Sequence, residues 1–263
     1  MRKILTLASA VLLPAAAMQV QALEFNILAG GNVWDASPSG SIQGKKSQSN
    51  LDVKNELGLS SENQSYFFVQ FDHPVPVIPN IRVSRTALDF SGNKNAEFDF
   101  LNSSFKGDLS TQVDLSHTDI TAYYRLLDGI SSFIPLVDLR AELGLTIRQF
   151  DGEFAVKGNT TSGDTSQSIS LNAPLPLGYA SLRLGLPLGI SFGAKVDAID
   201  YSGNSITDLT ADMRYQYEGF PLIKPGLTAG YRSLDIKLDD LKDTYGDLSV
   251  SGAFFGAYIR VGF

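Results

Sequence analysis

The sequence predicts an all-β protein, a closed antiparallel up-and-down transmembrane β-barrel of about ten strands with short periplasmic turns and long extracellular loops. The first observation is the end of the chain, where every second residue is apolar: Phe263, Val261, Ile259, Ala257 and Phe255. Strict alternation with small, polar or amphipathic residues is typical of a strand with one apolar face. The second observation is that no segment of the mature chain approaches the roughly 20 apolar residues of a transmembrane helix. A chain that spans a membrane without helices must close into a barrel, because open sheet edges cannot be satisfied in lipid.

Residues 1–22 predict a secretory signal peptide. Arg2 and Lys3 supply its positive region, residues 4–17 its apolar stretch, and Val20-Gln21-Ala22 a small-residue cleavage site. The apolar stretch is too short for a comfortable membrane anchor. We therefore expect one mature barrel domain at residues 23–263, a length that suits an undivided β-barrel.

The composition excludes several functions. The chain has no cysteine, which rules out thiol catalysis and thiolate metal sites. Without Arg2 and Lys3, 19 of the 21 basic residues remain against 28 acidic residues, for a net charge of −9. An acidic chain without a run of lysine or arginine is a poor nucleic-acid binder. We expect no nucleic-acid partner, no cofactor and no metal.

Ten strand candidates follow one another along the chain. They lie near residues 24–34, 64–73, 79–90, 112–127, 137–151, 177–186, 189–202, 205–218, 223–238 and 249–263. In the fifth candidate, Leu139, Ala141, Leu143, Leu145 and Ile147 share one face, and the later strands continue this face without a charge. The opposite face carries the charged residues Arg140, Glu142, Arg148, Arg183, Lys195, Asp197, Asp208, Asp212, Arg214, Arg232 and Arg260.

Periodicity alone does not choose between water and lipid, since a soluble barrel shows the same alternation with its apolar face inside. Three further features favour a membrane. The strands reach the roughly 9–11 residues of a tilted membrane strand. Long polar connections near 35–63, 91–111, 152–176 and 239–248 mostly alternate with short proline-containing turns, Gly203-Asn204 being the exception. Charge combined with glycine on the polar face fits a narrow polar lumen.

The charged face allows two interpretations, in both of which its residues line the lumen. One is a solute path with a mild anion preference, because seven of the charges are basic and four acidic and rings of charge set pore selectivity. The other is an ion-pair network that fills the barrel, since about eight strands already enclose an interior that side chains can fill. The small barrel favours the filled or nearly filled lumen.

Several segments resemble a poorly characterised proteobacterial outer-membrane β-barrel family that is labelled by a Gly-Gly in its first strand. The matching segments are Ala29-Gly30-Gly31, the proline-rich stretch at residues 73–83, residues 123–128 and Phe150-Asp151-Gly152. The resemblance extends over the mature chain, and the proline-rich stretch is its most specific part. It implies an outer-membrane barrel without an established activity, and a looser likeness to OmpW-like barrels implies passage of small or apolar solutes.

The same resemblance implies partners. Bacterial outer-membrane barrels present a C-terminal strand that ends in phenylalanine to the barrel-assembly machinery, which the strand ending at Phe263 matches. Outer-membrane lipid and lipopolysaccharide are the other expected partners.

Catalytic residues are not expected. His73 and His117 lie on opposite sides of the membrane in this topology, which argues against a shared metal site. Ser116, His117 and Asp119 suggest hydrolysis, but neighbours along a strand point to opposite faces, so Ser116 does not easily pair with His117. We therefore expect that the protein is not an enzyme.

Two functional hypotheses remain. The first is a narrow channel for small solutes in the bacterial outer membrane, with a polar, mildly cationic lumen. The alternative is a non-conducting structural or surface-interaction barrel that acts through its extracellular loops. The sequence names no solute.

Overall fold

The computed structural model describes residues 25–44, 48, 50–101, 103–126, 137–160, 163–172, 174–241 and 244–262. The predicted signal peptide, Phe263 and the proline-containing turn expected at 128–135, between the fourth and fifth strand candidates, lie outside the described residues. Within the described part of the chain, no helix is long and apolar enough to cross a membrane.

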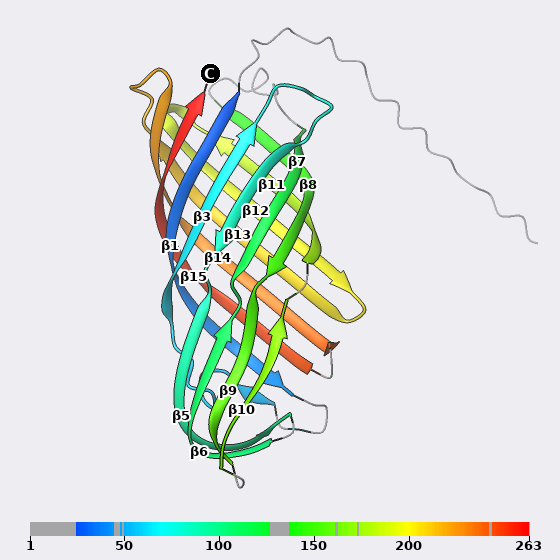
Figure 1. Ribbon diagram of the computed structural model, residues 1–263. Coiled ribbons are helices and arrows are strands. Elements are labelled where there is room, and N and C mark those ends of the chain that lie inside the picture. Colours follow the sequence, from blue (N-terminus) through cyan, green and yellow to red (C-terminus); the bar gives the residue numbers. More distant parts are fainter. Residues whose placement is uncertain are drawn as a thin grey trace, which may run out of the picture.

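Ten antiparallel strands form a closed ring, which confirms the predicted fold class (Figure 1). Strand β15 pairs with both β14 and β1, and this second pairing closes the barrel. The short strand β2 (Leu51–Asp52) adds only to the far end of β1. The ring consists of β1 (Asn26–Gln43), β3 (Glu62–Asp72), β4 (Asn80–Thr86), β7 (His117–Arg125), β8 (Asp138–Phe150), β11 (Pro174–Gly185), β12 (Ile190–Tyr201), β13 (Asn204–Gln216), β14 (Ile223–Leu241) and β15 (Thr244–Gly262).

A second sheet of four strands extends the wall of the barrel at one end. It consists of β5 (Asp89–Phe100), β6 (Ser103–Asp114), β9 (Gly152–Thr160) and β10 (Gly163–Leu171), in the order β10-β9-β6-β5. Figure 1 shows it below the ring, as two hairpins that prolong β4, β7, β8 and β11. We call this end of the molecule the outer end, and the opposite end, where β1 begins and β15 ends, the inner end.

Three segments that were predicted to be long loops form β-strands instead, so this part of the prediction is wrong. The segments 91–111 and 152–176 are largely β-hairpins, and 239–248 is the end of the β14–β15 hairpin. Within the connection predicted near 35–63, residues 53–57 form a turn. After β2, the carboxylate of Asp52 accepts hydrogen bonds from the backbone N–H groups of Lys54 (3.0 Å) and Asn55 (2.7 Å). Asp52 bonds the backbone as an aspartate does at the start of a helix, but the single turn that follows does not continue as a helix.

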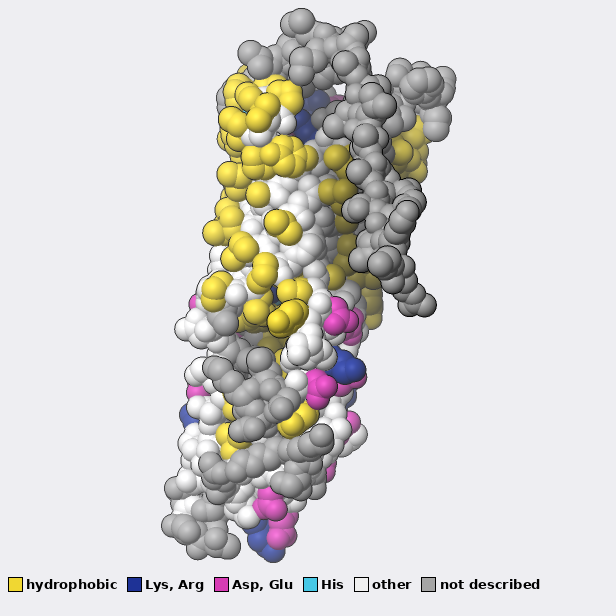
Figure 2. Space-filling view, turned by 90° about the vertical axis from the view of Figure 1, so that its right-hand side faces the viewer, with side chains coloured by type: hydrophobic (Ala, Val, Ile, Leu, Met, Phe, Trp, Pro, Cys, Tyr) yellow, Lys and Arg dark blue, Asp and Glu magenta, His cyan; other side chains and the backbone are white. Residues whose placement is uncertain are grey.

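The ring is apolar outside and polar inside over its inner half. Leu145 and Leu227 on the outer wall are 63% and 49% exposed, whereas Arg148 and Asp208 in the lumen are both 0% exposed. Hydrophobic side chains gather on this half of the surface in Figure 2. An exposed apolar band around a closed barrel with a polar interior is the pattern of a membrane-spanning barrel. The predicted orientation, with the leucine-rich face toward lipid, is thus confirmed.

The pattern reverses toward the outer end. Along β14, Tyr231 is the last large apolar residue on the outer wall, and Asp235 and Lys237 follow on that wall. On the lumen side, the buried Arg232 is followed by the buried Leu234 and Ile236. The four-stranded sheet follows the reversed pattern, because the described residues of β5, β6, β9 and β10 include no exposed large hydrophobic side chain. Its inward side chains join an apolar outer core that includes Phe90, Phe98, Phe100, Phe105, Leu109, Val113, Phe154, Val156, Leu234, Ile236, Leu248 and Val250.

The two glycines of the first strand lie where side chains do not fit. A Cβ atom on Gly30 would stand 2.7 Å from the carbonyl oxygen of Ala257 and 2.8 Å from Cβ of Tyr258. A Cβ atom on Gly31 would stand 2.8 Å from two ring carbons of Phe67 on the other face. The Gly-Gly pair therefore allows aromatic side chains to pack against both faces of β1.

A cation on the apolar band is expected to destabilise the barrel. We expect Leu145→Arg to lower the free energy of unfolding by about 2–4 kcal/mol, because the new charge would face hydrocarbon. Denaturant titration in lipid vesicles, followed by Trp34 fluorescence, measures the loss. The matched control is Ser110→Arg on the exposed face of β6, where we expect a change within about 0.5 kcal/mol. Equal losses in both variants would contradict the assignment of Leu145 to the lipid face.

Candidate functional site

Four charged side chains cross the lumen where the barrel changes from a polar to an apolar interior. Arg148 of β8 donates to Asp119 of β7 through Nε (2.8 Å) and Nη2 (2.8 Å), and its Nη2 also lies 2.6 Å from Oδ2 of Asp208 on β13. Arg232 of β14 donates to both oxygens of the same Asp208, at 2.9 and 2.7 Å. We call Asp119, Arg148, Asp208 and Arg232 the ionic layer. Its two positive and two negative charges balance, as buried charges require.

The surroundings of Arg232 leave it little freedom. Its guanidinium carbon lies 4.9 Å from the ring centre of Trp34 and 5.3 Å from that of Tyr66. Its Nη1 donates to the hydroxyl oxygen of Thr86 at 3.1 Å. Stacking of guanidinium on aromatic faces adds to the ion pair.

His117 is neutral in this arrangement. Its Nδ1 lies 2.7 Å from the carbonyl oxygen of Leu115, which only accepts, so Nδ1 carries the proton. Its Nε2 faces Nη2 of Arg232 at 3.3 Å and accepts from it. Ser116 has a different partner, because its hydroxyl accepts from the backbone N–H of Leu88 at 3.0 Å. Asp119 is held by Arg148, so the hydrogen bonds of these three side chains go to other residues.

A second cluster lies on the inner side of the ionic layer. Arg183 of β11 donates through Nη2 to both oxygens of Asp212 on β13, each at 2.9 Å. Arg214 lies 3.0 Å from the same carboxylate. Lys195 of β12 lies 2.7 Å from Asp197.

Hydroxyl groups extend this network around the wall. Asp197 also accepts from the hydroxyl of Thr146 at 2.6 Å, and Thr146 shares a 2.8 Å hydrogen bond with Thr121. Asp197 of β12 and Asp212 of β13 are thus each bonded to a strand two places away in the sheet, Asp197 to β8 through Thr146 and Asp212 to β11 through Arg183.

The three remaining predicted residues lie at the inner mouth, and each has different surroundings. Arg140 bonds Asp138 at 2.9 Å on the rim, and Glu142 accepts from the hydroxyl of Tyr179 at 2.6 Å. The side chain of Arg260 makes no hydrogen bond or ion pair with a described residue. The structure thus gathers the eleven predicted residues into an ionic layer, an inner cluster and a mouth.

Sequence reasoning missed two arginines of the lumen, Arg82 and Arg125. Arg82 alternates with Ile81 and Val83, which are 46% and 43% exposed on the outer wall. It donates to the hydroxyl of Tyr66 at 2.8 Å and stacks on Phe68 at 4.8 Å. The alternation of Arg82 with Ile81 and Val83 is the same signal that places the charges of the later strands in the lumen.

The lumen of the described barrel is nearly filled. Two cavities of about 40 Å³ each lie on the inner side of the ionic layer. On its outer side an apolar cavity of about 70 Å³ lies in the outer core, lined by residues such as Val113, Phe154 and Ile236. A cavity of this kind stays dry because it offers water no polar partner.

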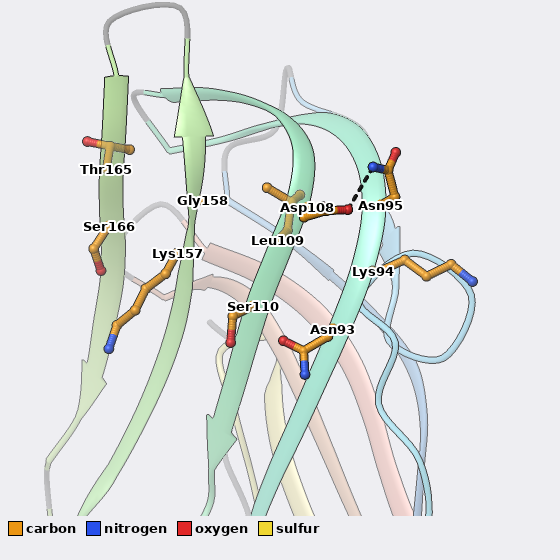
Figure 3. Close-up of a pocket in the computed structure, with 10 residues that line it drawn as sticks. All are labelled: Asn93, Lys94, Asn95, Asp108, Leu109, Ser110, Lys157, Gly158, Thr165 and Ser166. Atoms are coloured by element: carbon orange, nitrogen blue, oxygen red, sulfur yellow. Dashed lines mark hydrogen bonds between the residues drawn. The ribbon is translucent and has the colours of Figure 1, made fainter.

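The outer face of the four-stranded sheet carries an open groove of about 720 Å³ (Figure 3). Amide, hydroxyl and ammonium groups from all four strands line it. Asn95 and Asp108 bond each other across β5 and β6 at 2.8 Å. The lining comprises Asn93, Lys94, Asn95, Asp108, Leu109, Ser110, Lys157, Gly158, Thr165 and Ser166.

No known protein family and no curated protein matches this chain. Among solved structures it is similar to the outer membrane protease OmpT from Escherichia coli, with 10% identity, a TM-score of 0.41, and coverage of 95% of this chain and 99% of that chain. It is also similar to Ail, the attachment invasion locus protein of Yersinia pestis, with 11% identity, a TM-score of 0.29, and coverage of 91% and 99%. A third is the monoaromatic hydrocarbon channel CymD, with 12% identity, a TM-score of 0.30, and coverage of 93% and 70%. A protease, an attachment protein and a channel share little beyond the barrel, so the likeness carries no function.

Breaking the ionic layer is expected to destabilise the barrel strongly. We expect Asp208→Asn to lower the free energy of unfolding by about 3–5 kcal/mol, because it leaves two buried arginines with one carboxylate. Denaturant titration in lipid vesicles measures the loss. Lys106→Ala is the control, because its ion pair with Glu97 (2.8 Å) is exposed and such pairs contribute at most about 1 kcal/mol. A loss in Asp208→Asn no larger than in the control would show that the layer is not structural.

Proposed function

We propose that this protein is a non-conducting barrel of the bacterial outer membrane that acts through the polar face of its four-stranded sheet. The observation that carries this proposal is the complete burial of Arg148 and Asp208 across the lumen. The outer end then faces the cell exterior and the inner end the periplasm, as in bacterial outer-membrane barrels.

Two successive barriers support the closed state. The ionic layer crosses the lumen with paired charges, and among its described side-chain atoms only the buried Nη1 of Arg148 lacks a hydrogen-bond partner. Beyond it, ring contacts such as Phe100 to Phe154 (5.0 Å between centres) fill the interior with apolar groups. An ion that left water for this core would lose its hydration without compensation.

A narrow anion-selective channel is the other hypothesis from the sequence. Its positive lumen charge is present, but the cations nearest the centre are held by carboxylates at 2.6–2.9 Å. A paired cation contributes to wall stability more than to ion selectivity. The geometry therefore favours the surface-interaction barrel.

The groove on the four-stranded sheet supports a saccharide partner. Asn93, Ser110, Thr165 and Ser166 offer amides and hydroxyls that donate and accept hydrogen bonds with sugar hydroxyls. Lys157 adds a cation for a sugar-linked phosphate. Because the groove lies at the outer end, beyond the apolar band, the polysaccharide of lipopolysaccharide is the partner that we propose.

Further proposals follow the resemblance. We propose membership of the Gly-Gly outer-membrane family, assembly through the C-terminal strand, and no enzymatic role for Ser116, His117 and Asp119. The tight packing at Gly30 and Gly31 supports the first of these.

A closed barrel is expected to be silent in a planar bilayer. We expect no stepwise conductance from the folded protein, under conditions in which a general porin inserts and opens. Arg183→Ala and the outer-wall control Arg85→Ala are expected to be equally silent. Stepwise openings that lose anion preference in Arg183→Ala alone would establish the channel instead.

Saccharide binding is expected to depend on the groove. Polysaccharide released from lipopolysaccharide by mild acid is titrated into the detergent-solubilised protein by calorimetry. We expect Asn93→Ala with Lys157→Ala to weaken binding about tenfold, because each lost hydrogen bond contributes about 0.5–1.5 kcal/mol. Lys237→Ala, an exposed lysine on β14, is the control and is expected to bind as the unaltered protein does. Equal binding by both variants would contradict the assignment of the groove.

A further inference from the structure

The inner mouth of the barrel contains a strongly cationic pocket. Its charged lining has six arginines against only two carboxylates, Asp72 and Glu142. Lys and Arg side chains are visible inside the upper opening in Figure 2. The arginines are Arg82, Arg125, Arg140, Arg183, Arg214 and Arg260.

The pocket continues into the lumen. The next cavity shares Arg82, Ser181, Arg183 and Arg214 with it. It adds Lys195, which pairs with Asp197, and Asp212, which pairs with Arg183 and Arg214. Tyr66 lines this second cavity and also stacks on Arg232 of the ionic layer. The combined space therefore leads from the inner mouth to the ionic layer and keeps an excess of positive charge throughout.

Several guanidinium groups there are not satisfied by the protein. Nε of Arg82 is buried and has no hydrogen-bond partner. Arg260 makes no hydrogen bond or ion pair within the described part of the chain. Arg140 bonds only the rim residue Asp138. A guanidinium group presents five N–H donors, so donors remain free to face the pocket.

We propose that this pocket binds an oxyanion that enters from the periplasm. Arg140 pairs with Asp138, and Arg183 and Arg214 share Asp212, so the arginines still exceed their carboxylates. Such an excess of positive charge inside a membrane-embedded barrel is costly, and an anion of matching geometry lowers that cost. Guanidinium forks bind phosphate and carboxylate oxygens through paired, charge-assisted hydrogen bonds. A cavity of about 40 Å³ suits a small group such as a phosphate or a carboxylate head. The site does not depend on the external groove or on whether the barrel conducts.

The test is calorimetric titration of the folded, detergent-solubilised full-length protein with inorganic phosphate and, separately, with acetate, at constant ionic strength in chloride. We expect saturable phosphate binding that weakens at least tenfold in Arg140→Gln with Arg260→Gln. Lys106→Gln removes one positive charge on the exposed four-stranded sheet and is expected to bind within twofold of the unaltered protein. Heat-modifiable migration on gels verifies that each variant is folded.

The outcomes separate the ligand classes. Phosphate binding without acetate binding assigns the pocket to phosphate groups, and binding of both extends it to carboxylates. Absence of saturable heat with either anion, or equal binding by the double variant, overturns the proposal. If the double variant does not fold, Arg260→Gln alone decides, with at least a threefold loss expected and an unchanged affinity counting against the site. Phosphate binding supports this inference whether or not the barrel conducts. A barrel that does not bind phosphate contradicts it, even if the barrel conducts.

Discussion

The structure depends on one constraint: the sheet must face lipid along half of its length and water along the rest. The ionic layer of Asp119, Arg148, Asp208 and Arg232 lies at the level where that change occurs. On its inner side, side chains that point outward meet hydrocarbon and those that point inward are polar. On its outer side, the outward side chains are polar and the inward ones form an apolar core. Single strands such as β14 pass through both environments while paired with a strand on each side.

This arrangement explains why the charges of the layer are tolerated. Each carboxylate is bonded to an arginine that reaches it from another strand, and Asp208 connects Arg148 of β8 with Arg232 of β14. These strands are not neighbours in the sheet, so the layer spans the lumen and sets the distance between its walls. A well-packed apolar substitute is often at least as stable as a buried ion pair. What the ion pairs add is directional bonding, which favours one arrangement of the strands over shifted ones.

The sequence predicted the ring well because alternation in the later strands was unbroken. Leu143, Leu209 and Phe255 were assigned to the outer wall and are 52%, 48% and 60% exposed. The four-stranded sheet was missed because its outward residues, such as Asn93 and Ser110, have the composition of loops. Phe98 and Phe100 nevertheless alternate with polar residues. Such alternation does not show which face of a strand is inside, because the apolar face points outward in lipid and inward in water. Nor does it predict that Arg148 meets Asp208, because that contact depends on closure of the ring between β1 and β15.

The ionic layer and the inner mouth differ in how their buried charges are balanced. At the ionic layer the charges are equal in number, and they bond one another at 2.6–2.9 Å with no solvent contact for Arg148 and Asp208. At the inner mouth the arginines exceed the carboxylates that line the same space. A protein that needed positive charge only for its fold would balance it, as the layer does. The excess at the mouth is maintained where periplasmic solutes have access, so its compensation must come from water or from an anion. Guanidinium groups are weakly hydrated and geometrically matched to oxyanions, which makes the anion the better partner.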